Sequence, residues 1–199
     1  PFAKRKDLIF IGGFQHHPNI DAVEYFVGEV MPLLRKKIPG VVLHVVGSKV
    51  PPQIAGLQGP DVVIHGFVED LEPLLDQMRV SIAPLRYGAG IKGKIGTAMT
   101  AGLPVVATTM AAEGMELSAG ENILIADDPE PLAAAVADVY LNEDLWNRIS
   151  ANGLELAEHA WGGASAWRIL KDLLGELGMQ PQDPVYPISL YTEESITSP

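Results

Sequence analysis

Cysteine is absent from the 199-residue sequence, and its absence removes several kinds of chemistry at once. Without thiols the chain forms no disulfide, holds no metal through thiolates and offers no cysteine nucleophile. The absence suits a reducing compartment, so we expect a cytoplasmic protein. The sequence also lacks three or four residues at metal-ligand spacing, and we therefore expect no metal and no other cofactor.

Positive charge is scarce. Lysine and arginine number 14 against 25 aspartates and glutamates, which gives a net charge of −11. A nucleic-acid-binding surface is expected to be basic, so the composition argues against nucleic acid as a general partner. It still allows one local basic site, and Arg86, Lys92 and Lys94 lie close together in the sequence.

Long apolar runs are missing as well. No stretch reaches the roughly 18 residues that cross a bilayer, and Pro1 to Asp7 lacks the apolar core of a signal peptide, so we expect no transmembrane segment. The sequence opens without methionine on a basic, linker-like stretch, and we expect a domain cut from a longer protein. No Ser-His-Asp set or catalytic carboxylate pair stands out, which gives a hydrolase little support.

Hydrophobic residues make up 47% of the chain, mostly in short runs that alternate with segments of helical spacing. This alternation predicts an α/β, Rossmann-like parallel sheet of about six strands with helices on both faces. We assign residues 1–177 to this domain and residues 178–199, punctuated by prolines, to an extended or disordered tail. The expected strands are 7–12, 41–47, 62–66, 80–84, 104–107 and 122–126, and the expected helices are 18–35, 69–77, 94–101, 132–141, 145–156 and 167–177.

A loop rich in glycine and lysine, residues 86–93, separates the fourth expected strand from a short helix. Glycines let backbone N–H groups approach an anion closely, and the helix that follows points its unpaired N–H groups at the same place. Lys92 and Lys94 add positive charge there. The stretch therefore predicts a site for a phosphate or diphosphate group; the alternative is a flexible surface connection with solvated lysines.

Ligands of open parallel sheets bind outside the carboxyl ends of the strands, and four loops are expected at that edge. Residues in two of these loops have a second interpretation. Gly12-Gly13 is either a tight turn or a ligand contact. Either one of His16 and His17 reaches the crevice or both lie on the surface. Glu113 either accepts hydrogen bonds from ligand hydroxyls or sits in a plain turn. The four loops are residues 12–19, 66–68, 86–93 and 108–114.

Five motifs occur in order between about Leu8 and Trp161: FIGG with HPNIDA, HGFVED, APLRYGAGIKGK, AMTAGLPVVAT and AAEGM. Together they resemble the C-terminal half of the retaining GT-B-fold glycosyltransferases (glycosyl transferases group 1). The resemblance implies one half of a GT-B fold that binds a UDP-, GDP- or ADP-sugar without a metal. It also implies an N-terminal acceptor domain, missing here, and transfer of a hexose to a glycan, lipid or small-molecule acceptor. We expect the isolated chain to bind nucleotide but to transfer little sugar.

Carried over by position, the resemblance gives Lys92 and Lys94 a catalytic role, in which they offset phosphate charge as the leaving group departs. It places the remaining site residues around the nucleotide sugar. These residues are Gly12, Gly13, His16, Gly66, Phe67, Val68, Arg86, Gly88, Ala89, Gly90, Ile91, Thr97 and Glu113.

The sequence departs from the family at two positions. The family usually has a glutamate that holds the ribose and another that contacts the donor sugar, whereas this chain has Thr97 and Ala89 there. The site is then either a variant led by the lysines or the remnant of one in a non-catalytic assembly module. A nucleotide-sugar epimerase half-domain, which shares the architecture, is a third interpretation.

Overall fold

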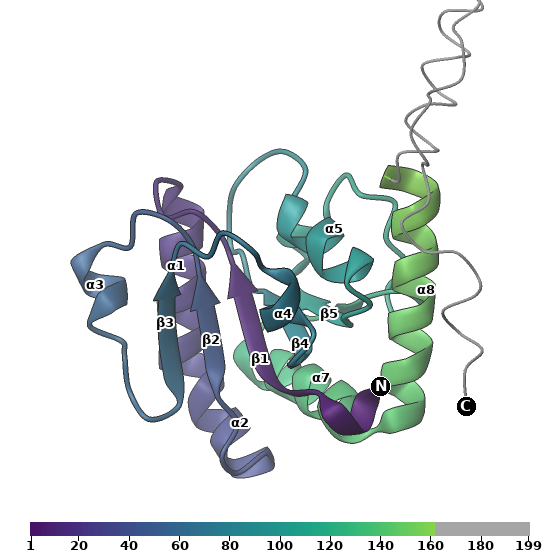
Figure 1. Cartoon of the computed structure of the whole chain (residues 1–199), viewed down its shortest axis with the longest axis horizontal. Helices are drawn as coiled ribbons and strands as arrows, with labels where there is room; N and C mark the ends of the chain where they lie inside the picture. The colour runs from purple at the N-terminus through teal and green to yellow at the C-terminus, as the bar shows by residue number, and fades with distance from the viewer. Residues whose placement is uncertain (162–199) are drawn as a thin grey trace, which may run out of the picture. The chain divides into compact units, whose positions relative to one another are not determined.

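The computed structural model describes residues 1–161 (Figure 1). Six parallel strands form one sheet in the order β3-β2-β1-β4-β5-β6, so the Rossmann-like prediction is confirmed. The helix expected at 167–177, the tail and the boundary at residue 177 lie outside the described residues. The strands are β1 (Lys6–Ile11), β2 (Leu43–Val46), β3 (Val62–Gly66), β4 (Met78–Ala83), β5 (Val105–Ala107) and β6 (Leu124–Ile125).

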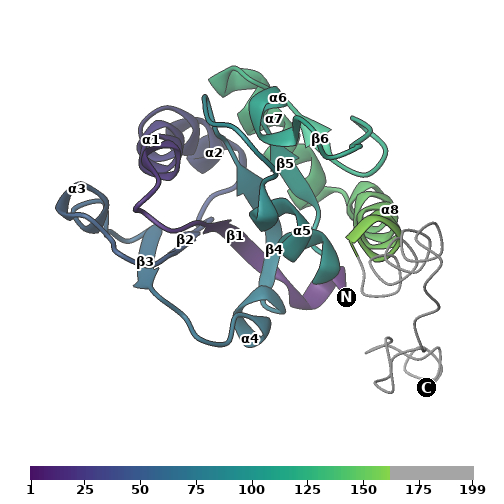
Figure 2. The same cartoon turned by 90° about the horizontal axis from the view of Figure 1, so that it is seen from above.

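Helices cover both faces of the sheet: Figure 2 shows α1, α2 and α7 on one face and α4 and α5 on the other. Residues 1–154 form one compact unit, which contains the whole sheet. The helical segments are η1 (Phe2–Lys4), α1 (His17–Tyr25), η2 (Phe26–Val30), α2 (Met31–Lys37), α3 (Pro52–Ala55), α4 (Glu72–Leu75), α5 (Gly93–Thr100), α6 (Thr109–Ala112), α7 (Pro129–Leu141) and α8 (Glu143–Trp161).

The helix expected at 18–35 is longer than predicted and is interrupted by a π turn, η2. Pro32 has no N–H, and its ring would clash with the carbonyl four residues earlier, that of Gly28. A wider turn relieves this clash, and the N–H of Met31 donates to the carbonyl of Phe26, five residues back. Periodicity does not predict α3 and α6, because both are single turns inside segments with loop composition.

The two central strands, β1 and β4, carry the core. Leu8, Ile9, Phe10 and Val80 are fully buried, and Ile82 is nearly so. From β1 the chain passes outward to β2, whereas β4 lies on the other side of β1 and continues to β5. The strand order therefore reverses between β1 and β4, and in open parallel sheets a crevice opens at such a point, beyond the carboxyl ends of the strands.

Arg79 near the start of β4 holds the first residues of the chain against α7. Its Nε donates to the carbonyl of Arg5 (2.7 Å), its Nη2 to that of Phe2 (3.2 Å) and its Nη1 to that of Tyr140 (3.2 Å). The guanidinium also lies 4.1 Å from the centre of the Phe2 ring and 4.7 Å from that of Tyr140. This cluster lies at the amino ends of the strands, opposite the crevice.

Replacing Arg79 with alanine removes three charge-assisted hydrogen bonds and two cation–π contacts, and it leaves three carbonyls short of a partner. We expect the variant to lose about 2–4 kcal/mol of unfolding free energy. Urea titration measures the loss of unfolding free energy, and the m-value, the slope of that free energy against urea concentration, should not change. The control is Arg148→Ala, because Arg148 donates one hydrogen bond, to the exposed carbonyl of Gly120, and its loss should cost under about 1 kcal/mol. Equal stabilities of the two variants would contradict this account of the cluster.

Candidate functional site

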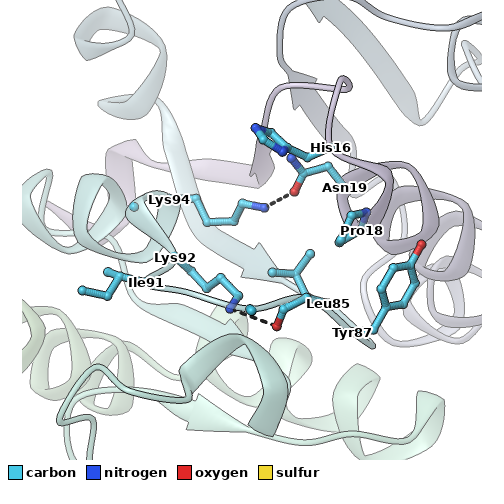
Figure 3. A pocket seen from close by; sticks show the side chains of 11 residues that line it. His16, Pro18, Asn19, Leu85, Tyr87, Ile91, Lys92 and Lys94 are labelled. Carbon is cyan, nitrogen blue, oxygen red and sulfur yellow. Dashed lines mark hydrogen bonds between the residues drawn. The ribbon is translucent and has the colours of Figure 1, made fainter.

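A hollow of about 400 Å³ opens where the strand order reverses (Figure 3). One wall is the beginning of α1, and the other is the glycine-rich loop between β4 and α5 together with the first residues of α5. We call it the switch-point hollow. Its lining residues are His16, Pro18, Asn19, Leu85, Tyr87, Gly88, Ala89, Ile91, Lys92, Gly93 and Lys94.

Lys94 points inward from the first turn of α5. Its Nζ donates to Oδ1 of Asn19 and lies 4.6 Å from the centre of the Phe10 ring. Asn19 in turn donates from Nδ2 to the carbonyl of Gly13 (2.7 Å), so one amide links the lysine to the turn after β1. Burial, and secondarily the charge of Lys92, lower the pKa of Lys94 to about 8. The predicted juxtaposition of lysine and glycine turn is therefore present in the structure.

Gly12 is required by this arrangement. A Cβ at Gly12 would lie 2.8 Å from Cγ of Asn19, closer than non-bonded carbon atoms approach. Any larger residue would push Asn19 away from Lys94 and from the carbonyl of Gly13. His16 is the N-cap of α1, and Asn19 lies inside the helix with its side chain buried.

Lys92 lines the same hollow but is tied to its own loop. Its Nζ donates to the carbonyl of Gly90 (2.5 Å) and, more weakly, to that of Gly88 (3.4 Å). Both glycines have positive φ, +123° at Gly88 and +82° at Gly90, a conformation that other residues rarely adopt. Lys92 is also the N-cap residue of α5, so it shapes the loop while it adds charge to the hollow.

Several predicted site residues lie outside the switch-point hollow. Arg86 forms a bidentate ion pair with Asp21 and stacks on Tyr25, and its hydrogen bond to Asp21 raises the pKa of the guanidinium. Thr97 is exposed on α5. The loop of residues 66–68 follows the edge strand β3, and the ring of Phe67 is 74% exposed. The ligand contacts predicted for these residues stay predictions.

Glu113 lines a second hollow of about 480 Å³, beyond the ends of β5 and β6. We call it the β5–β6 hollow. The sequence predicts that Glu113 shares one crevice with the lysines, whereas in the structure Glu113 lines a hollow to which neither Lys92 nor Lys94 contributes. The residues that line this second hollow are Thr109, Met110, Ala112, Glu113, Ile125 and Asp127.

The two strand histidines form a pair away from both hollows. Nδ1 of His44 on β2 lies 2.8 Å from Nε2 of His65 on β3, and burial lowers the pKa of each. Within residues 1–161, no group of three or more histidines and carboxylates is placed to hold a metal ion. Nor does any described helix have the length and apolar character that a membrane span requires.

The family model for glycosyl transferases group 1 matches residues 5–142, and the chain belongs to this family. An uncharacterized 44.6 kDa protein of the cps region of Klebsiella pneumoniae is 23% identical over 161 residues. That match covers 76% of this chain but 42% of the Klebsiella protein, so the chain spans less than half of its relative.

Two solved structures share the fold. A point mutant of TarM from S. aureus, crystallised with Fondaparinux, α-GlcNAc-glycerol and UDP, superposes with a TM-score of 0.72 at 18% identity, over 86% of this chain and 35% of TarM. The C-terminal domain of the group 1 family protein LpcC from Francisella tularensis gives a TM-score of 0.64 at 18% identity, over 79% of this chain and 86% of that domain. The described fold is thus the Rossmann-like fold that TarM and the C-terminal domain of LpcC also contain.

Replacing Lys94 with methionine should stabilise the protein near neutral pH. The folded state holds a charged lysine at a pKa of about 8 instead of 10.5, and one pKa unit corresponds to about 1.4 kcal/mol. After allowance for the lost contacts to Asn19 and Phe10, we expect a gain of about 1–3 kcal/mol at pH 7.

The gain should shrink as the pH rises from 8 toward 10.5. In this window the folded wild type releases its proton before the unfolded chain does, so wild-type stability rises with pH. Urea unfolding at pH 7, 8 and 9.5 measures the difference, with Lys36→Met on the exposed end of α2 as control. A Lys94→Met variant that is less stable than wild type at pH 7 would contradict the assigned burial cost.

Proposed function

We propose that the chain is the donor-binding half of a glycosyltransferase that moves a hexose from a nucleoside-diphosphate sugar to an acceptor. One observation carries the proposal: the ammonium of Lys94 is held beside the turn after β1 in a hollow that α5 enters by its N-terminus. Family membership and the UDP present in the TarM complex support it. The acceptor, a glycan, lipid or small molecule, would be bound mainly by an N-terminal domain outside this chain.

The chemistry would be electrostatic. As the bond to the sugar breaks, negative charge collects on the departing diphosphate. Lys94, Lys92 and the free N–H groups at the start of α5 would offset that charge, and they are held in place before the reaction begins. A volume of about 400 Å³ falls within the range of ligand sites. The cytoplasmic location and the absence of a cofactor remain expectations from composition and family resemblance.

Nucleotide affinity should depend on pH through Lys94. An anionic diphosphate favours the protonated lysine, so UDP, GDP or ADP should bind most tightly at about pH 7, where the terminal phosphate is still ionised. Binding should weaken as the pH rises through the free-site pKa of about 8. Near pH 8, binding should also take up a fraction of a proton. Calorimetry in two buffers of different ionisation enthalpy measures both effects.

Lys94→Met should weaken nucleotide binding about tenfold to a hundredfold and abolish its pH dependence, because it removes one charge-assisted hydrogen bond. Lys36→Met serves as the control. It removes an exposed positive charge from α2, outside the lining of the switch-point hollow, and the variant should bind nucleotide with the affinity of the wild type. Binding of no nucleotide, or equal binding by the Lys94→Met variant, would contradict the site.

Thr97 offers a gain-of-affinity test of the family assignment. The family places a ribose-binding glutamate at this position, and Thr97 is exposed on α5, where a longer side chain fits. Thr97→Glu should tighten nucleotide binding about tenfold, because a charged hydrogen bond replaces a neutral or absent one. Thr100→Glu adds the same charge to the exposed end of the same helix and should not tighten binding. Equal nucleotide affinities of the two variants would contradict the placement of the ribose beside position 97.

A non-catalytic module is the second candidate, favoured by Thr97 and Ala89 in place of the two glutamates. Such a module would keep the fold and lose nucleotide affinity, so the calorimetry above decides between the two functions. An epimerase would need carboxylates or a histidine as acid and base in the cleft. The described lining of the switch-point hollow contains no carboxylate but includes His16, so product analysis with a donor and no acceptor separates an epimerase from a transferase.

A further inference from the structure

The β5–β6 hollow and the switch-point hollow open beyond the same carboxyl edge of the sheet but differ in charge. The switch-point hollow is lined by Lys92 and Lys94. The β5–β6 hollow is lined by two carboxylates, Glu113 and Asp127, and by no cationic side chain among the described residues. A phosphate in the β5–β6 hollow would meet like charge, so its ligand differs in chemistry from the diphosphate of the donor.

Asp127 is fixed in place with acceptor capacity to spare. Its Oδ1 accepts from the N–H of Thr109 (2.8 Å) and its Oδ2 from the hydroxyl of Thr109 (2.8 Å). A carboxylate has about four lone-pair sites, so roughly two remain for a ligand. The backbone carbonyl of Asp127 also accepts from the hydroxyl of Tyr25 (3.0 Å), which anchors this residue to α1.

Glu113 follows the last residue of α6 and is exposed, and its carboxylate accepts no hydrogen bond from the residues that the structure describes. The apolar side chains of Met110, Ala112 and Ile125, all partly exposed, line the same hollow. The hollow thus combines hydrogen-bond acceptors with apolar surface. A sugar ring matches this pair of features, because its hydroxyls donate hydrogen bonds and its C–H face is apolar.

We propose that the β5–β6 hollow binds a neutral sugar ring of the acceptor, with Glu113 and Asp127 accepting hydrogen bonds from its hydroxyls. The proposal rests on the proposed transferase function, because a transferase brings donor and acceptor to one edge of the sheet. It assigns part of acceptor recognition to the donor half of the enzyme and gives Glu113 a role separate from nucleotide binding.

Chemical-shift mapping on the isotope-labelled chain tests the proposal, with methyl α-glucoside and methyl α-mannoside as separate probes and UDP as the reference ligand. The glycosides, added to about 100 mM so that a Kd in the mM range registers, should shift residues 109–113 and 125–127. UDP should shift residues 88–94 instead.

Glu113→Gln should weaken glycoside binding about fivefold to tenfold and leave UDP binding unchanged, because a neutral amide replaces a charged acceptor. Glu121→Gln removes a carboxylate from the exposed loop before β6, outside the hollow, and is the matched control. Ala112→Leu narrows the hollow without changing charge and should also weaken the glycosides.

The outcomes separate this inference from the proposed function. Two results would overturn this inference and leave the proposed function standing. In the first, UDP changes the chemical shifts of residues 88–94 but the glycosides do not change those of residues 109–113. In the second, Glu113→Gln binds the glycosides as tightly as the wild type does. Glycoside shifts at 109–113 without any nucleotide binding would support a sugar site but overturn the proposed transferase. Glycoside shifts confined to 88–94 would overturn the separate acceptor site.

Discussion

The contact on which the site depends is the hydrogen bond between Lys94 and Asn19. It joins the start of α5 to the turn after β1 across the place where the sheet changes direction, and through Asn19 it reaches the carbonyl of Gly13. Holding a charged amine there is costly, as the pKa of about 8 shows, and proteins tolerate such a cost at sites where a ligand supplies the missing counter-charge. Gly12 is the geometric condition for the contact, because any side chain there would displace Asn19.

The charges along the carboxyl edge follow from where each loop leaves the sheet. The loop after β4 brings lysines to the switch point, while the segments after β5 and β6 bring Glu113 and Asp127 to a second hollow. Arg86 begins the same loop as the lysines, but its ion pair with Asp21 and its contact with the Tyr25 ring hold its charge against α1. A strongly acidic chain thereby places lysines at one hollow and carboxylates at the other.

The sheet could be predicted because its strands are short, continuous apolar runs between turn residues, and their length and alternation with segments of helical spacing identify them as strands. The joining of Lys94 to the turn after β1 could be predicted because parallel strands end at one edge. What could not be predicted depends on contacts between distant residues. Arg79 reads as an isolated charge until Phe2 and Tyr140 are seen on either side of its guanidinium. The role of Asn19 could not be predicted either, because its contacts with Lys94 and the carbonyl of Gly13 exist only in the fold. The position of Glu113 depends on how far apart β4 and β6 lie, which spacing in the sequence does not report.

The π turn at Phe26–Val30 has a consequence for the orientation of the helical segments on either side of it. A π turn holds one more residue than an α turn over nearly the same length, so the helical segments before and after it keep their buried faces aligned only because that extra residue is present. Deleting one residue from this turn would convert it to an α turn and would rotate the buried face of α2 by about 100° relative to that of α1.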